Sequence, residues 1–445
     1  MNRLSSIAEA GRSLRSGQTT PVDLLEECLG RIDDTEADVR AWVVIDREGA
    51  RRAAETATDE LRRGGDRGPL HGLPVGVKDI IDVAGLPTLA GARVRPNVPA
   101  AADAFVVAKL RQAGAVVLGK TVTTEFASFD PPPTRNPYDP ERTPGGSSSG
   151  SAAAVVAGHC YAALGSQTGG SVIRPASYCG AAGMKPTWGR LSLSGIVPLA
   201  MHLDHPGPMA RSAADLAATY AALAEFDPND PCSIPRPTAD RIDRRPRTSP
   251  PRVGIVGEYF ADHATPTVRD AAAAAIDRLR AAGAQVDEVR LPPSFAEVHA
   301  SHRRIMAVEA AAYHRETFAA RRAEYGPRIT ELLDEGLAAT TADYCRALEH
   351  QLRFRRDMER LVESSGVDAL AMPAVANTAP PRATTGDPSF QSPWSFSGLP
   401  VVSLPVGCGT DGLPVALQFV AAPWTEFALL ATAEWCDERL RSGVR

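Results

Sequence analysis

A stretch of small residues at 136–183 constrains the fold of this chain more than any other feature. It is rich in Gly, Ser and Ala, a composition that also occurs in flexible linkers. The linker interpretation fails for most of it, because residues 152–158 have the pattern of a small apolar helix and residues 181–185 that of a buried segment. Small residues that are not solvated indicate close packing of one backbone against another. We therefore expect this stretch inside a folded domain.

Apolar periodicity on both sides of this stretch predicts strands that alternate with helices. Thr20-Pro21 is typical of a helix start, because proline is favoured at the first helical position. Further helices are predicted at 51–63, 104–113, 268–282, 296–362 with a break at Gly326-Pro327, and 426–439. Strands are predicted at 73–80, 115–118, 252–256, 285–291, 367–373, 399–406 and 413–419. The alternation implies an α/β fold in which a mixed sheet is covered by helices.

Residues 227–252 form the one plausible connecting segment, because they contain seven prolines and many charges between two structured halves. The net charge of the chain is only −5, from 48 Lys+Arg and 53 Asp+Glu. Such a chain has no global field to hold nucleic acid or an anionic membrane. We therefore expect neither as a partner.

Cysteine usage and hydropathy indicate the compartment. The seven cysteines are scattered and none forms a CxxC pair, so neither a disulfide framework nor a zinc cluster is expected. The first 18 residues contain no apolar signal region. No apolar run reaches the roughly 18 residues that a membrane span requires. We expect a cytoplasmic protein.

Two glycine- and serine-rich motifs are candidates for chemistry. Residues 145–151 read GGSSSGS, but a phosphate-binding P-loop requires lysine where Ser151 stands, and the glycine spacing of a dinucleotide-binding fingerprint is absent. Residues 168–171 read TGGS, which suits a nucleophilic serine on a tight turn whose backbone N–H groups converge as an oxyanion hole requires. The motif is not the GxSxG elbow, because Ile173 stands where that motif has glycine.

Lys78 is the candidate base that would activate such a serine. It lies in an apolar strand between Val77 and Ile80, in a chain with only four lysines (Lys78, Lys109, Lys120 and Lys185). A desolvated lysine has a lowered pKa and can serve as a neutral base. Arginine, which supplies the other cations of this chain, does not deprotonate near neutral pH.

These pieces together resemble the amidase signature family. Residues 145–187 read GGSSSGSAAAVVAGHCYAALGSQTGGSVIRPASYCGAAGMKPT, which is similar to the long signature of that family. Further similar segments are 69–91, 124–126, 135–137, 206–211 and 393–418, so the resemblance covers most of the chain. It implies one amidase-type domain at 1–445 with a mixed central sheet sandwiched by helices. It also implies a catalytic core at 66–215 and a helical, substrate-side region at 295–365.

The resemblance implies a Ser-cisSer-Lys triad. Ser171 matches the nucleophile, Lys78 matches the base, and Ser147 matches the bridging serine after a cis peptide bond from Gly146. The backbone N–H groups of Thr168, Gly169, Gly170 and Ser171 match the oxyanion hole, and Ser149 and Gln167 match supporting positions. The expected reaction is hydrolysis of a carboxamide to an acid and ammonia or an amine, with no cofactor and no metal.

Two positions depart from the family pattern. The family commonly has aspartate four residues before the nucleophile and arginine two after it, whereas this chain has Gln167 and Ile173, with Arg174 one place later. If the two usual charges pair, losing both together avoids an unmatched buried charge. A neutral replacement is therefore the hypothesis for this pair.

Other functions stay open at this point. The same acyl-enzyme supports acyl transfer or cyclisation, and the chain also resembles the glutaminase component of a tRNA-dependent amidotransferase, which requires partner subunits. A homodimer is a further expectation. His202 with His205 and His299 with His302 suggest a metal site less well than packing roles, because no third ligand follows in register. Cys179 suits a buried packing role better than that of a nucleophile.

Overall fold

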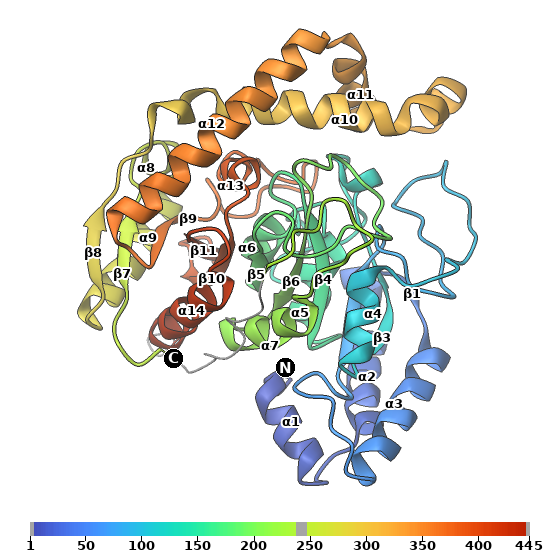
Figure 1. Cartoon of the computed structure of the whole chain (residues 1–445). Helices are drawn as coiled ribbons and strands as arrows, with labels where there is room; N and C mark the ends of the chain where they lie inside the picture. Colours follow the sequence, from blue (N-terminus) through green and yellow to red (C-terminus); the bar gives the residue numbers. More distant parts are fainter. Residues whose placement is uncertain (1–3, 237–246, 442–445) are drawn as a thin grey trace.

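The computed structural model describes residues 4–236 and 247–441 and shows one large domain (Figure 1). In spatial order, its single sheet contains, within these residues, β1 (Trp42–Ile45), β3 (Val116–Thr121), β2 (Pro74–Lys78), β4 (Ala162–Gln167), β6 (His205–Ala210), β5 (Ala182–Lys185), β10 (Val401–Cys408), β11 (Pro414–Val420), β9 (Ala369–Pro373), β7 (Arg252–Ile255) and β8 (Gln285–Glu288). Parallel pairing joins β2 to β3 and β4, and β7 to β8 and β9, whereas the other neighbours are antiparallel. The predicted α/β fold with a mixed sheet is confirmed.

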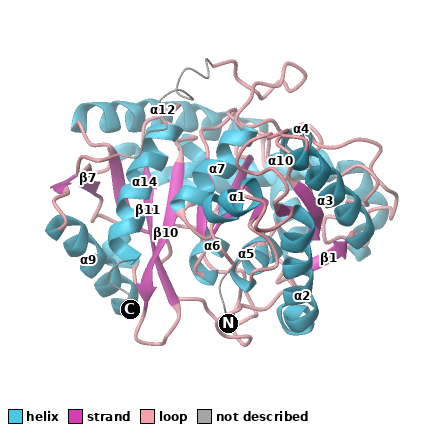
Figure 2. Ribbon diagram, turned by 90° about the horizontal axis from the view of Figure 1, so that it is seen from below, coloured by secondary structure: helices cyan, strands magenta, loops and turns pink. Residues whose placement is uncertain are grey.

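Helices sandwich the sheet. They are α1 (Ile7–Arg15), α2 (Pro21–Val39), α3 (Arg47–Arg62), α4 (Phe105–Gln112), α5 (Ser149–Ala157), α6 (Ile173–Cys179), α7 (Ala213–Leu223), α8 (Phe260–His263), α9 (Pro266–Ala281), α10 (Val298–Arg321), α11 (Pro327–Ala338), α12 (Thr341–Ser365), α13 (Ser392–Ser397) and α14 (Glu426–Arg441). Helices α14 and α7 pack together and lie over the strands in Figure 2. Helices α10, α11 and α12 extend across the top of Figure 1. None of the helices in the described residues has the length and apolar character of a bilayer span.

The small residues at 136–183 lie in the interior, as predicted. Helix α5 is buried from Ser149 to Val155, and every residue of β4 is buried. A methyl group on Gly150 would overlap the backbone of Ala41 and Val122, and one on Gly207 of β6 would overlap the Met184 carbonyl. Glycine is required at these two positions because one backbone lies directly against another.

The structure differs from the sequence prediction at several elements. The long helical region breaks a second time, between α11 and α12, where Thr340 caps the N-terminus of α12. Strand β4 has the sequence AALGSQ and β6 has HPGPMA, and neither has the β-branched composition that predicts a strand. The sheet also continues across the predicted connecting segment at 227–252, of which residues 237–246 lie outside the described part of the chain.

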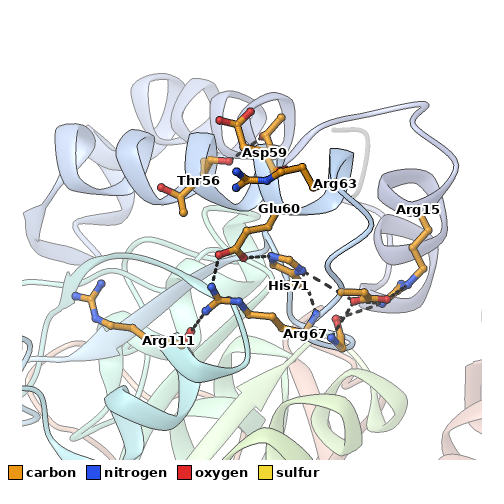
Figure 3. A network of polar contacts seen from close by, with 12 residues as sticks. Arg15, Thr56, Asp59, Glu60, Arg63, Arg67, His71 and Arg111 are labelled. Atoms are coloured by element: carbon orange, nitrogen blue, oxygen red, sulfur yellow. Dashed lines mark hydrogen bonds and ion pairs between the residues drawn. The ribbon is translucent and has the colours of Figure 1, made fainter.

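A polar network fixes the chain just before β2 (Figure 3). His71 is buried, its Nδ1 accepts the Arg67 backbone N–H at 3.1 Å, and its Nε2 lies 3.0 Å from Glu60 Oε2 on α3. Arg67 also pairs with Glu60, and Arg15 pairs with Asp66. The network therefore ties α1 and α3 to the start of the strand that carries Lys78.

His159, the second residue after α5, provides a test of the core by pH. Its Nδ1 accepts the Trp42 indole N–H at 3.2 Å, and burial lowers the pKa of His159 from 6.5 to about 4. The neutral form therefore stabilises the fold above pH 6.5, and this contribution is lost as the pH falls through 4. From pH 7 to pH 4 the loss amounts to about 3 kcal/mol of unfolding free energy.

The measurement is chemical unfolding of the wild type and His159→Gln at several pH values, followed by tryptophan fluorescence. Glutamine retains a donor and an acceptor but does not titrate in this range. We expect the stability of the wild type to fall more steeply than that of the variant between pH 6.5 and pH 4. Parallel curves would contradict a neutral, buried His159.

Candidate active site

Lys78 lies at the end of β2 and its side chain is fully buried. Its Nζ donates hydrogen bonds to Ser147 Oγ at 2.7 Å and to Ser166 Oγ at 2.9 Å. Burial lowers the pKa of Lys78 well below its usual range, and the negative charge of Asp204 opposes this shift. The site therefore favours the neutral amine, which has a lone pair that can accept a proton.

Ser147 lies in the turn before α5, and the Gly146–Ser147 peptide bond is cis, as the resemblance implied. The Ser147 carbonyl accepts the Thr124 N–H at 3.2 Å. Gly146 has no room for a side chain, because a Cβ atom would lie 2.9 Å from Thr385 Cγ2 and 3.0 Å from Thr124 Cγ2. These contacts place the Ser147 hydroxyl beside the lysine amine.

Ser171 lies on the turn between β4 and α6, and only 6% of its surface is exposed. Its carbonyl accepts the Ser148 N–H at 3.2 Å, so the turns that carry Ser147 and Ser171 are in direct contact. In the described residues the two hydroxyl groups form no hydrogen bond with each other. One link of the predicted relay, Lys78 to Ser147, is thus formed, and catalytic hydrogen bonds are often long in the absence of substrate.

The turn before Ser171 is held by its carbonyl groups. His302 Nε2 lies 2.9 Å from the Thr168 carbonyl, Ser395 Oγ donates to that of Gly169 at 3.1 Å, and the Arg174 N–H donates to that of Gly170 at 2.8 Å. Because the N–H of each planar trans peptide points opposite to its C=O, these bonds also fix the N–H groups of residues 169–171. Those three N–H groups donate no hydrogen bond within the described residues, so they are free to bind an oxyanion.

Asp204 is a buried carboxylate at the site that the sequence analysis did not identify. Its Oδ1 accepts the Thr168 hydroxyl at 2.5 Å, and its Oδ2 accepts the N–H groups of Leu199 and Ala200 at 2.9 and 3.0 Å. Burial raises the pKa of Asp204 to about 6 against these hydrogen bonds. Asp204 therefore links the oxyanion turn to the charge balance at Lys78. A lone aspartate carries no motif that would have revealed it.

Gln167 takes the place of the usual aspartate as an acceptor. Its Oε1 accepts the N–H groups of Val172 and Ile173, each at 3.0 Å, and its Nε2 donates to Ser395 Oγ at 3.2 Å. Arg174 is buried, and in the described residues it forms no ion pair with a carboxylate. This arrangement agrees with the hypothesis of a neutral replacement for the Asp–Arg pair.

The support for Lys78 comes from a different serine than the one predicted. Ser149 Oγ donates to the Val122 carbonyl at 3.4 Å, whereas Ser166 on β4 contacts the amine. The physical reason is that Ser149 begins α5, which faces the turn after β3, while β4 runs parallel beside β2. Pairing between neighbouring strands, which spacing in the sequence does not reveal, brings Ser166 to Lys78.

The four candidate histidines lie apart. His202 pairs with Glu309, His205 Nδ1 lies 2.6 Å from the Leu203 carbonyl, and His299 lies 3.2 Å from Ser392 Oγ, while His302 holds Thr168. Among the described residues, no three potential ligands group as a metal site. The Cys179 Sγ lies 3.4 Å from the Pro144 carbonyl, and burial raises the pKa of this thiol. A reactive thiolate is therefore not favoured there.

Comparisons with known proteins agree with this geometry. The family model Amidase matches residues 23–430. A protein of the glutamyl-tRNA(Gln) amidotransferase from Chloroflexus aggregans is 36% identical over 470 residues, which are 96% of this chain and 95% of that protein. The solved peptide amidase from Stenotrophomonas maltophilia is 32% identical with a TM-score of 0.87, covering 98% of this chain and 97% of that one.

A second solved structure, of a vestigial protein complex related to the origins of an s-triazine catabolic enzyme, gives a TM-score of 0.90 at 33% identity and covers 99% of both chains. The fold and the site define an enzyme that acts on carboxamides. The chain belongs to the Amidase family, and it is an amidase that works through a serine acyl-enzyme.

Proposed function

We propose that Lys78, Ser147 and Ser171 carry out the hydrolysis of a carboxamide to a carboxylic acid and ammonia or an amine. The observation that carries this proposal is the 2.7 Å contact between Ser147 Oγ and the Nζ of a fully buried lysine. A neutral amine in that position accepts the Ser147 proton while Ser147 takes the proton of Ser171. Ser171 Oγ then attacks the amide carbonyl carbon.

The reaction proceeds in two halves. The tetrahedral oxyanion binds to the free N–H groups at residues 169–171, whose carbonyl partners are already fixed. The relay then runs in reverse, so that the leaving nitrogen receives the proton from Lys78 through Ser147 and the C–N bond breaks. A water molecule attacks the acyl-enzyme with the same base and releases the acid.

Replacing the nucleophile tests the assignment first. Ser171→Ala is expected to abolish ammonia release from a panel of aryl, alkyl and amino-acid amides, with the melting temperature of the protein preserved. The matched control is Ser177→Ala, because Ser177 is a buried serine on α6 whose hydroxyl donates only to the Ile173 carbonyl. Turnover by Ser171→Ala at the rate of the wild type would refute the proposal.

Lys78 is tested by retaining its charge. Lys78→Ala and Lys78→Arg are both expected to lower kcat at pH 7 by about 10²- to 10⁴-fold, since neither supplies a neutral base and a guanidinium does not deprotonate. Rates of ammonia release measured from pH 6 to pH 10 give the profile of each variant. An active Lys78→Arg enzyme would show that a cation, and not a base, is required.

Two neighbouring glycines provide a matched pair for the oxyanion hole. A Cβ on Gly170 would overlap the amide of the buried Gln391, which is itself bonded to the Ala374 carbonyl, whereas a Cβ on Gly169 would meet Pro388 and His302 at 3.5 and 3.6 Å, an ordinary contact. Gly170→Ala is expected to lower kcat by about 10²-fold through displacement of the N–H groups. Gly169→Ala is expected to lose much less; equal losses would contradict this geometry.

A second function follows from the amidotransferase relatives, which match almost the whole chain. As the glutaminase component of such an enzyme, the chain would release little ammonia from glutamine until partner subunits were added. Activity of the isolated chain on the amide panel, with little on glutamine, favours the independent amidase. Amide products formed on addition of free amines would indicate acyl transfer instead. A cytoplasmic location and a homodimer stay predictions of the sequence.

A further inference from the structure

We infer that Arg174 is a positioning residue that holds the Gly146 peptide, and with it the Ser147 hydroxyl, in line with Lys78. This inference rests on the proposed function and adds a residue to it. Arg174 Nη2 donates to the Gly146 carbonyl at 2.8 Å and to Thr385 Oγ1 at 3.4 Å. The backbone N–H of Arg174 donates to the Gly170 carbonyl. One residue thus contacts the turns of both serines.

The guanidinium is placed at a cost to stability. The residue is 1% exposed, its Nε and Nη1 are buried without a hydrogen-bond partner, and in the described residues no carboxylate pairs with it. Burying a cation without an ion pair is costly, and apolar side chains of similar volume often replace buried charges with no loss of stability. Stability of the fold therefore does not account for an arginine at this position.

The Gly146 carbonyl accounts for it better. Within the described residues, Arg174 provides the only hydrogen bond to this carbonyl. The Gly146 carbonyl and the Ser147 nitrogen belong to the same peptide unit, so the direction of the carbonyl sets the direction in which Ser147 leaves that peptide. Thr124 and Thr385 limit movement of Gly146 from the side, but neither donates to its oxygen. Without Arg174 the peptide is free to tilt and Ser147 Oγ to leave the lysine amine.

The sequence context gives Arg174 this reach. Ile173, the preceding residue, is buried and its N–H is bound by Gln167, which turns the first residues of α6 against β4. Arg174 is one position further along this short helix, and its side chain extends to the Gly145–Ser147 turn. Gln167 therefore holds the turn of Ser171 as a neutral acceptor, while Arg174 reaches the turn of Ser147 as a donor.

The test combines stability with the reactivity of Ser171. A fluorophosphonate probe labels an activated serine, and its kinetics separate the maximal labelling rate kinact from the binding constant KI. For Arg174→Met we expect kinact to fall at least ~10-fold, as small misplacements of catalytic groups do, with KI changed less than about 3-fold. The melting temperature is expected to stay level or rise, because a buried unpaired charge is removed.

Arg278→Met is the matched control, because Arg278 also donates to backbone carbonyls, those of Val406 and Leu440, but lies away from the site. It is expected to lower the melting temperature and leave kinact unchanged. Arg174→Lys retains a charged donor and is expected to label faster than Arg174→Met. Arg174→Gln, which is neutral and shorter, replaces the Met variant if that variant does not fold.

Labelling of Arg174→Met at the rate of the wild type would overturn the inference, as would a Lys variant no faster than the Met variant. A fall in kinact that only follows a fall in melting temperature would show a structural role and also overturn it. Failure of the proposed function looks different: the wild type itself would then not be labelled at Ser171.

Discussion

The desolvation of one lysine is the constraint on which the rest of the site depends. An amine in water is protonated at neutral pH and cannot accept a proton, whereas the buried Lys78 amine has its pKa lowered well below the usual range. Its two serine partners, Ser147 and Ser166, satisfy it with neutral hydroxyl groups and bring no counter-charge that would restore the ammonium. Asp204 is the one anion that opposes the shift, and it is bound by three donors of its own.

The sheet explains why this arrangement needs a large domain. Lys78 comes from β2, Ser166 from the neighbouring β4, and Ser171 from the turn that follows β4. The carbonyl groups of that turn are then held by His302 on α10 and Ser395 on α13, more than a hundred residues further along the chain. The C-terminal half thus supplies no member of the proposed triad, but it fixes the peptide planes whose N–H groups would bind the oxyanion.

Much of this was predictable from the sequence, and the reasons are specific. The interior position of residues 136–183 and the α/β class followed from small-residue composition and periodicity, and both are confirmed. The placement of Lys78 beside Ser147 and the cis bond before Ser147 followed from the resemblance to one family. Ser166, Asp204 and His302 were missed, because their roles arise from strand pairing and from contacts between distant segments. Strands β4 and β6 were missed because Gly, Ala and Pro carry little strand propensity.

The central claim is that the Lys78 amine is uncharged at neutral pH. The chain has only four lysines, so an NMR titration of protein labelled at the lysine side chains gives few signals, and Lys78→Met assigns the signal of Lys78. The account predicts that this signal has the chemical shift of a neutral amine at pH 8. A Lys78 signal that remained that of an ammonium up to pH 10 would contradict the account.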